Sequence, residues 1–212
     1  KWQSDRISVN PQSFTNATLK AIGRHHSVEE TIEKFHLARE HGMNNINMDL
    51  IIGLPNEDET HYAHSLAETE KLMPESVTMH TLSFKRASHM SQNKEKYKVA
   101  DRKTTERMMQ MGVDWAKEHE YIPYYMYRQK NILGNLENVG YSKFGEESLY
   151  NIVIMEEAQT IIGLGSGATS KFMKHGSRKL QQYMNPKDPA SYALTIDQSI
   201  EEKIDWLNKI VK

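Results

Sequence analysis

The 212-residue sequence contains no cysteine, so disulfide bonds and all cysteine-ligated metal or iron–sulfur sites are excluded on this chain. It also lacks an excess of charge of either sign. The 27 Lys and Arg residues stand against 28 Asp and Glu residues, which gives a formal net charge of −1 at pH 7. Nucleic-acid and membrane-surface partners usually select a one-signed patch, and we therefore expect neither.

Long apolar runs are missing as well. No stretch approaches the ~20 apolar residues of a membrane span, and the first six residues have no signal-peptide core. We therefore expect a cytoplasmic protein. The histidines considered as metal ligands are His25, His26, His61, His64 and His80. No third ligand stands at a convincing metal spacing from any of them, and we assign no metal to the chain.

Strand and helix patterns alternate along the first 118 residues. Residues 6–12, 45–53 and 76–83 are strand-like. The capping box Ser27-Val-Glu-Glu30 predicts a helix that stops at Gly42, and a second helix is expected over 57–73. This order implies parallel strands with right-handed crossovers. A long helix is expected over 101–118, with Met108, Met111 and Trp115 packed in the core.

The pattern changes beyond residue 118. Residues 121–129 are aromatic and strand-like, and 131–147 are rich in Gly and Asn, which predicts a loop. Short strands are expected over 149–155, 159–164 and 180–184, with a short helix near Tyr192 and an amphipathic helix from Ser199. We therefore predict an α/β fold in which residues 1–118 form a partial barrel and residues 119–212 a smaller mixed α+β subdomain.

Three polar residues stand where they can meet at one rim of such a barrel. Gln12 and Asp49 lie at or inside the ends of strand-like runs, and Arg24 closes an amphipathic segment. Folds of this type bind ligands at that rim. A carboxylate inside the apolar strand around Asp49 is costly without donors. This favours a ligand or a partner such as Arg24, and a buried salt bridge without a ligand is the competing interpretation.

Five segments carry a family resemblance. They are Arg6-Ile-Ser-Val-Asn-Pro-Gln12, Leu19-Lys-Ala-Ile-Gly-Arg24-His-His, Asn47-Met-Asp49-Leu-Ile-Ile-Gly53-Leu-Pro55, Tyr124-Tyr-Met-Tyr-Arg-Gln-Lys-Asn131 and Gly163-Leu-Gly-Ser-Gly-Ala-Thr-Ser170. In order and spacing they resemble the radical S-adenosylmethionine (SAM) enzymes of the oxygen-independent coproporphyrinogen III oxidase group, and most of all its coproporphyrinogen dehydrogenase branch. The resemblance runs from Arg6 to about Tyr192. It implies part of a three-quarter TIM-like barrel followed by a family-specific carboxy-terminal subdomain.

The resemblance also implies a cofactor site. In this family the positions of Gln12, Arg24, Asp49, Thr81 and Thr169 contact S-adenosylmethionine. The family holds a [4Fe–4S] cluster on three cysteines near the start of the barrel, and this chain has none. We therefore expect the chain to be the carboxy-terminal part of a longer protein, with the cluster present only in the full-length form, and to be inactive alone.

The implied activity is oxidative decarboxylation of coproporphyrinogen III propionates to vinyl groups by a 5′-deoxyadenosyl radical in haem biosynthesis. Four propionates need cationic anchors, for which Arg86, Arg128 and Lys130 are candidates. Tyrosines are interleaved with Arg128 and Lys130, and this pattern is also compatible with binding of single-stranded nucleic acid or with a solvated edge strand. The expected partners are a porphyrinogen and an electron-donor protein. The truncated barrel is also expected to self-associate through its open sheet edge.

Three other functions remain open. One is a haem-binding chaperone of the same family, although Tyr150-Asn151-Ile-Val-Ile154 lacks the His and Tyr of the His-Asn-x-x-Tyr motif associated with haem. The second is a related radical enzyme that opens haem, and the third is a degenerate binding module. The Gly163 to Ser170 run superficially resembles a phosphate-binding loop, but it lacks the Gly-Lys-Ser/Thr ending of the Walker pattern.

Overall fold

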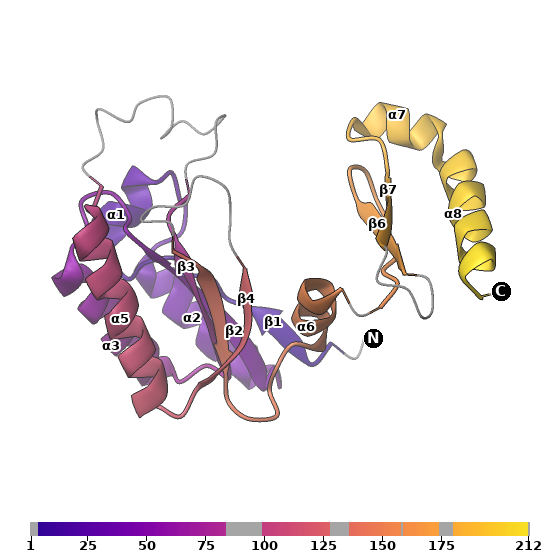
Figure 1. Cartoon of the computed structure of the whole chain (residues 1–212). Coiled ribbons are helices and arrows are strands. Elements are labelled where there is room, and N and C mark those ends of the chain that lie inside the picture. Colours follow the sequence, from indigo (N-terminus) through magenta and orange to yellow (C-terminus); the bar gives the residue numbers. More distant parts are fainter. Residues whose placement is uncertain (1–3, 84–98, 128–135, 158, 174–179, 212) are drawn as a thin grey trace. The chain divides into compact units, whose positions relative to one another are not determined.

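The computed structural model describes residues 4–83, 99–127, 136–157, 159–173 and 180–211 (Figure 1). The chain divides into two compact units, Lys1–Glu147 and Ser148–Lys212. The first unit contains a five-stranded sheet in the order β1-β2-β3-β5-β4, and the second contains the two-stranded sheet β6-β7.

The first sheet combines parallel and antiparallel strands. Its strands are β1 (Arg6–Ser8), β2 (Asn45–Ile52), β3 (Ser76–Thr81), β4 (Ile122–Tyr127) and β5 (Asn138–Ser142). The predicted parallel pairing of β1, β2 and β3 is observed. β5 then inserts between β3 and β4 and runs antiparallel to both. The predicted loop over 131–147 is therefore wrong for the residues of β5, whose two neighbours in the sheet were not evident from its short, glycine-containing sequence.

The helices of this unit are α1 (Asn16–Ala21), α2 (Val28–Glu40), α3 (Glu59–Leu72) and α5 (Arg102–Glu118). Local signals explain their starts. Ser27 and Glu30 form the predicted capping box of α2, and Asp58 caps α3. α2 ends before Gly42, whose φ of +82° is the left-handed conformation that glycine adopts without strain.

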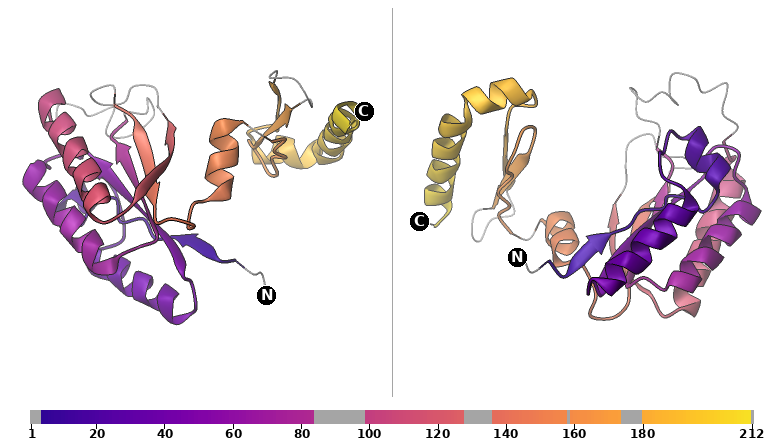
Figure 2. Two further views of the ribbon diagram at one scale, coloured as in Figure 1. Left: turned by 60° about the horizontal axis from the view of Figure 1, so that its bottom comes forward. Right: turned by 180° about the vertical axis from the view of Figure 1, so that it is seen from behind.

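The core of the first unit lies between the sheet and α2, α3 and α5, which Figure 2 shows together on one side of the strands. Every second residue of β2 enters this core: Ile46, Met48, Leu50 and Ile52 are all at most 1% exposed. Phe35, Tyr62 and Met108 of the three helices are at most 2% exposed and pack against them. The period of two therefore assigns the alternate residues of each strand to the opposite face.

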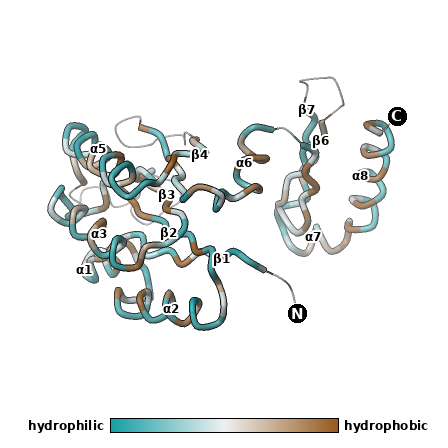
Figure 3. The backbone as a smooth tube through the Cα atoms, turned by 90° about the horizontal axis from the view of Figure 1, so that it is seen from below, coloured by the Kyte–Doolittle hydropathy of each residue, from teal (hydrophilic) through white to brown (hydrophobic). Residues whose placement is uncertain are grey.

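The second unit contains α6 (Leu149–Glu156), β6 (Thr169–Met173), β7 (Leu180–Met184), α7 (Pro189–Leu194) and α8 (Ile196–Val211). The predicted strand over 149–155 is wrong, because this segment is the apolar helix α6 (Figure 3). A short apolar run does not distinguish a helix from a strand, and Ser148 caps the helix by accepting from the Asn151 N–H at 3.4 Å. The expected strand over 159–164 is reduced to one bridge between Ile161 and Lys171.

The two units divide after Glu147 and not at residue 118. The reason is pairing: β4 and β5, which lie beyond residue 118, complete the sheet of the first unit through β3. The smaller unit packs Phe172 of β6 against Trp206 of α8, with ring centroids 6.0 Å apart. Its core is therefore formed by α8 and the β6-β7 hairpin.

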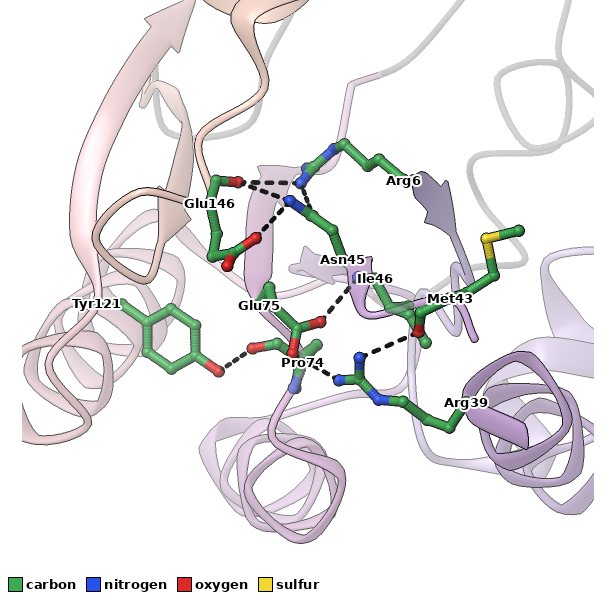
Figure 4. A network of polar contacts seen from close by, with 9 residues as sticks. All are labelled: Arg6, Arg39, Met43, Asn45, Ile46, Pro74, Glu75, Tyr121 and Glu146. Carbon is green, nitrogen blue, oxygen red and sulfur yellow. Dashed lines mark hydrogen bonds and ion pairs between the residues drawn. The ribbon is translucent and has the colours of Figure 1, made fainter. Parts of the chain in front are cut away.

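Polar side chains join the β2 and β3 starts to α2 at the end of the sheet opposite the predicted rim (Figure 4). Glu75 accepts from the Ile46 backbone N–H at 2.8 Å and from Arg39 Nη2 at 2.7 Å. Arg39 Nη1 also donates to the Met43 carbonyl at 3.2 Å. One carboxylate therefore fixes the end of a helix to the first residues of two neighbouring strands.

We expect Glu75→Gln to lower the free energy of unfolding by about 1–2 kcal/mol, because the amide can replace only part of these charge-assisted bonds. Glu75 is 20% exposed, so solvent screens the pair weakly. Glu33→Gln is the matched control: Glu33 pairs with Lys34, both are more than half exposed, and the change should stay within about 0.5 kcal/mol. Urea denaturation of the chain measures both. Equal effects of the two substitutions would contradict the assigned role of Glu75.

Candidate active site

One face of the five-stranded sheet is polar. β2 contributes Asn45, Asn47 and Asp49 to it, and β3 contributes Thr78 and His80. Asp49 is in register with Thr78, so these side chains stand next to each other across the two strands. Parallel sheets normally bury both faces under apolar contacts. A parallel sheet with helices on one face and hydrogen-bonding groups on the other is typical of a barrel wall whose interior holds a polar ligand.

Asn47 organises the middle of this face. Its Oδ1 accepts from the hydroxyls of Ser76 at 3.1 Å and Thr78 at 3.3 Å, and its Nδ2 donates to Asp49 Oδ1 at 2.8 Å. Both ends of the amide are therefore fixed, and Asn47 presents a donor to the carboxylate.

Asp49 carries the negative charge of this face. Its Oδ2 lies 3.5 Å from His80 Nε2. Burial alone would raise the pKa of Asp49, but its interaction with His80 and the hydrogen bonds from Asn47 and Thr78 outweigh burial, and the pKa lies below its usual value. The suggested pairing with Arg24 is wrong: the partner of Asp49 in the structure is His80, which the register of β3 places nearby.

Two tyrosines from β4 extend the polar face across β5. The Tyr127 hydroxyl lies 3.2 Å from His80 Nδ1, and the Tyr125 hydroxyl lies 3.1 Å from the Thr78 hydroxyl. The two tyrosine rings are nearly parallel, at 5°, with centroids 6.2 Å apart. Burial raises the pKa of Tyr125 to about 12, so its hydroxyl is neutral at pH 7. The ring and the hydroxyl of Tyr125 both form part of the polar face.

A cavity of about 250 Å³ adjoins this cluster. Its lining residues are Gln12, Ile51, His80, Thr81, Leu82, Ser83 and Tyr127. The predicted residues Gln12 and Thr81 thus share one cavity, and His80 links it to Asp49. The Oγ1 of Thr81 is buried without a hydrogen-bond partner among the described residues, which leaves a polar atom unsatisfied at this position.

Gln12 is held to the strand that carries Asp49. Its N–H donates to the Asp49 carbonyl and its own carbonyl accepts from the Ile51 N–H, both at 2.9 Å. Its φ is +68°, a conformation uncommon outside glycine. Such strain persists only where surrounding contacts enforce it, and it is concentrated at functional sites.

The other predicted residues lie elsewhere. Arg24 is exposed and lines a separate cavity of about 640 Å³ together with Asn10, His25 and Lys34. Thr169 begins β6 in the second unit. The expected substrate anchors Arg86, Arg128 and Lys130 lie outside the described residues.

Sequence reasoning missed His80 as a site residue and considered Tyr127 only as one of the tyrosines interleaved with the expected substrate anchors. The signal was present in β3, where Ser76, Thr78 and His80 alternate with buried apolar residues. A period of two puts all three on one face. What the pattern did not contain was the partner from β4, because that strand is separated from β3 by β5.

Glu57 is a buried carboxyl beside the strand end that carries Gln12. It is 5% exposed, and Ser13 Oγ donates to its Oε1 at 2.5 Å. Burial raises the pKa of Glu57 above its usual value, despite the opposing bonds from Ser13 and Thr18. Its charged form is therefore disfavoured in the folded chain.

In the unfolded chain the pKa of Glu57 is near 4.5, and in the folded chain it is higher. The stability that the neutral carboxyl contributes should therefore be fully present below about pH 4.5 and be lost as the pH rises through the folded-state pKa. We therefore expect Glu57→Gln to be more stable than the wild type at pH 8 and no more stable at pH 4. Denaturation at both pH values measures this difference. A gain that is the same at both pH values would contradict the assigned titration.

The parallel strands β1 to β3, with helices on one face and this polar site on the other, have the arrangement of a partial TIM-like barrel wall. Residues 3–68 match the Radical SAM superfamily model. Over 210 residues the chain is 65% identical to the oxygen-independent coproporphyrinogen-III oxidase-like protein HemZ of Bacillus subtilis (strain 168). The aligned region covers 99% of this chain and 42% of that protein. The resemblance inferred from the sequence is confirmed: nearly the whole chain is similar to part of a protein named for this group.

Two further proteins are similar. The heme chaperone HemW of Bacillus subtilis (strain 168) is 26% identical over 77% of this chain and 40% of its own length. The structure of coproporphyrinogen III oxidase (HemN) from Escherichia coli, described as a radical SAM enzyme, superposes with a TM-score of 0.64 at 17% identity, over 92% of this chain and 44% of that one. This likeness confirms the predicted fold class. The chain spans less than half the length of each of these relatives.

The superfamily implies two cofactors, and they fit this chain differently. The chain has no cysteine, and no group of three or more potential His, Asp or Glu metal ligands occurs in the described segments, so the residues present do not fit a [4Fe–4S] cluster. S-Adenosylmethionine needs hydrogen-bond acceptors and donors, which Asp49, Gln12 and the unpaired hydroxyl of Thr81 can supply. No helix in the described part of the chain is long and apolar enough to cross a membrane.

Proposed function

We propose that this chain is part of a radical SAM oxygen-independent coproporphyrinogen III oxidase or dehydrogenase, and that the whole protein converts propionate side chains of coproporphyrinogen III to vinyl groups. The observation that carries the proposal is the ionised Asp49 on a polar barrel face beside the cavity of Gln12, in a chain 65% identical to a coproporphyrinogen-III oxidase-like relative. Each propionate would lose carbon dioxide, one hydrogen atom, which would end up in 5′-deoxyadenosine, and one electron, which would pass to an electron acceptor.

Within this function the chain supplies part of the S-adenosylmethionine pocket. Asp49 would accept hydrogen bonds from hydroxyl groups of the ligand, Gln12 would bond to an amide-like edge, and Arg24 would pair with a carboxylate. Thr81 completes the contacts proposed for the first unit, and the contact that the family resemblance implies for Thr169 remains a separate proposal for the second unit. When bound, S-adenosylmethionine supplies the radical chemistry of the superfamily. This chain binds and orients it, and the cluster belongs to another part of the whole protein.

The substrate side of the proposal rests on charge. A porphyrinogen with four propionates needs cations, and we assign this role to Arg86, Arg128 and Lys130. The parallel rings of Tyr125 and Tyr127 would offer a flat wall to the substrate. The whole protein would also need an electron donor. We place the whole protein in the cytoplasm.

The test uses the whole protein, reconstituted anaerobically with iron and sulfide and incubated with S-adenosylmethionine, reductant and coproporphyrinogen III. Mass spectrometry follows 5′-deoxyadenosine and the loss of carbon dioxide from the porphyrinogen. Both products are expected. Deoxyadenosine without decarboxylation would retain the radical chemistry and reject the substrate, and the absence of both would reject the proposal.

The similarity to the heme chaperone HemW favours one alternative, a haem-binding chaperone. Tyr150 and Ile154 occupy the positions where the haem-associated motif has His and Tyr, which counts against it. The same preparation distinguishes the two functions, because a chaperone would bind haem tightly and release no carbon dioxide.

A further inference from the structure

Tyr127, His80 and Asp49 form a series of polar contacts across three strands. The Tyr127 hydroxyl lies 3.2 Å from His80 Nδ1, and His80 Nε2 lies 3.5 Å from Asp49 Oδ2. Tyr127 reaches over β5 to make its contact, 47 residues away in sequence. The His80 and Tyr127 rings also meet edge to face at 71°, with centroids 6.2 Å apart. The imidazole is therefore held on both of its nitrogens.

The ionised carboxylate decides the tautomer of His80. A carboxylate is ionised at neutral pH, so Oδ2 is an acceptor and the Nε2 that faces it carries a proton. In the neutral ring Nδ1 is then an acceptor, so the Tyr127 hydroxyl donates to it. A hydrogen bond at one ring nitrogen fixes the proton on the other, as it does for metal-bound histidines. Without Tyr127, the proton can occupy either nitrogen.

These contacts fix the orientation of the Asp49 carboxylate. Asn47 holds Oδ1 at 2.8 Å and His80 holds Oδ2, so the plane of the carboxylate is fixed from two sides. His80 and Tyr127 also line the cavity that contains Gln12. We infer that His80 and Tyr127 are positioning residues, which keep the Asp49 carboxylate oriented for its ligand. The inference rests on the proposed function in taking that ligand to be S-adenosylmethionine.

Calorimetric titration of S-adenosylmethionine into the reconstituted whole protein tests the inference. His80→Phe should raise Kd ~10-fold, because one charge-assisted hydrogen bond to the carboxylate is lost. His80→Gln should recover most of this affinity, because its amide can still donate. Tyr127→Phe should raise Kd about threefold, the lower end of the effect of one neutral hydrogen bond. Tyr121→Phe is the matched control, since it removes a tyrosine hydroxyl bonded to the Pro74 carbonyl, outside this cavity.

A double-mutant cycle separates positioning from general packing. If Tyr127 acts through His80, Tyr127→Phe should have no further effect on Kd in the His80→Phe background. Additive effects of the two substitutions would overturn the inference. So would a Kd of the His80→Phe or Tyr127→Phe protein that equals that of the Tyr121→Phe control.

A measurement without ligand keeps this inference distinct from the proposed function. The ¹⁵N chemical shifts of His80 in the 212-residue chain should report a proton on Nε2 in the wild type and a mixed tautomer in Tyr127→Phe. Unchanged shifts would overturn the positioning role. Wild-type whole protein that binds no S-adenosylmethionine would instead reject the proposed function, and the His80 shifts would still decide whether Tyr127 sets the tautomer.

Discussion

Replacing Asp49 with alanine in the whole protein is expected to weaken S-adenosylmethionine binding by ~100-fold, the upper end of the effect of losing a charged hydrogen-bonding group. The side chain is 20% exposed and lies beside the cavity of Gln12 and His80, where its negative charge can accept hydrogen bonds from the ligand. Loss of 5′-deoxyadenosine formation should accompany the loss of binding. Calorimetry and mass spectrometry measure the two effects separately.

Asp114→Ala is the control for this substitution. Asp114 is exposed on α5, where it accepts from Gln110 at 2.9 Å, and its removal should leave both measurements unchanged. Asp49→Ala protein that binds with wild-type affinity would exclude Asp49 from the ligand site. Circular dichroism and urea denaturation of each variant establish that it is folded.

The second large effect is expected at Gly140, in the middle of β5. A Cβ at this position would lie 1.8 Å from Cε1 of Tyr125, and its three nearest atoms all belong to that ring. The ring therefore lies directly over the glycine backbone. We expect Gly140→Val to lower the free energy of unfolding by about 3 kcal/mol, the upper end of the cost of overpacking, although valine itself favours strands. Urea denaturation measures the loss.

The clash at Gly140 has a specific suppressor. Tyr125→Ala removes all three atoms that a new Cβ would meet, so the double variant Gly140→Val and Tyr125→Ala should be more stable than Gly140→Val alone. If the double variant is less stable than the single one, the tyrosine ring is not the cause of the cost. Gly140→Val alone should also disturb the hydrogen bond between the Tyr125 and Thr78 hydroxyls, and with it the polar face.

Local signals were sufficient for much of the fold. The alternation in β2 and β3 reflects one buried face, and the capping box at Ser27 starts α2 through contacts within one turn. The parallel order of β1, β2 and β3 followed from the alternation of strands and helices, since each crossover helix can pack on the sheet in only one hand. Such features depend on neighbours in sequence, which is why they could be predicted.

The sequence by itself determined that the chain holds no cysteine ligands, that Gln12 and Asp49 stand at neighbouring strand ends, and that the chain resembles a radical SAM barrel. Only the tertiary structure decided the partner of Asp49, the placement of β5 between β3 and β4, and the helical state of α6. His80 meets Tyr127 because β5 fills the gap between their strands. Pairing between strands so far apart in sequence depends on the packed sheet as a whole, and no local pattern encodes it.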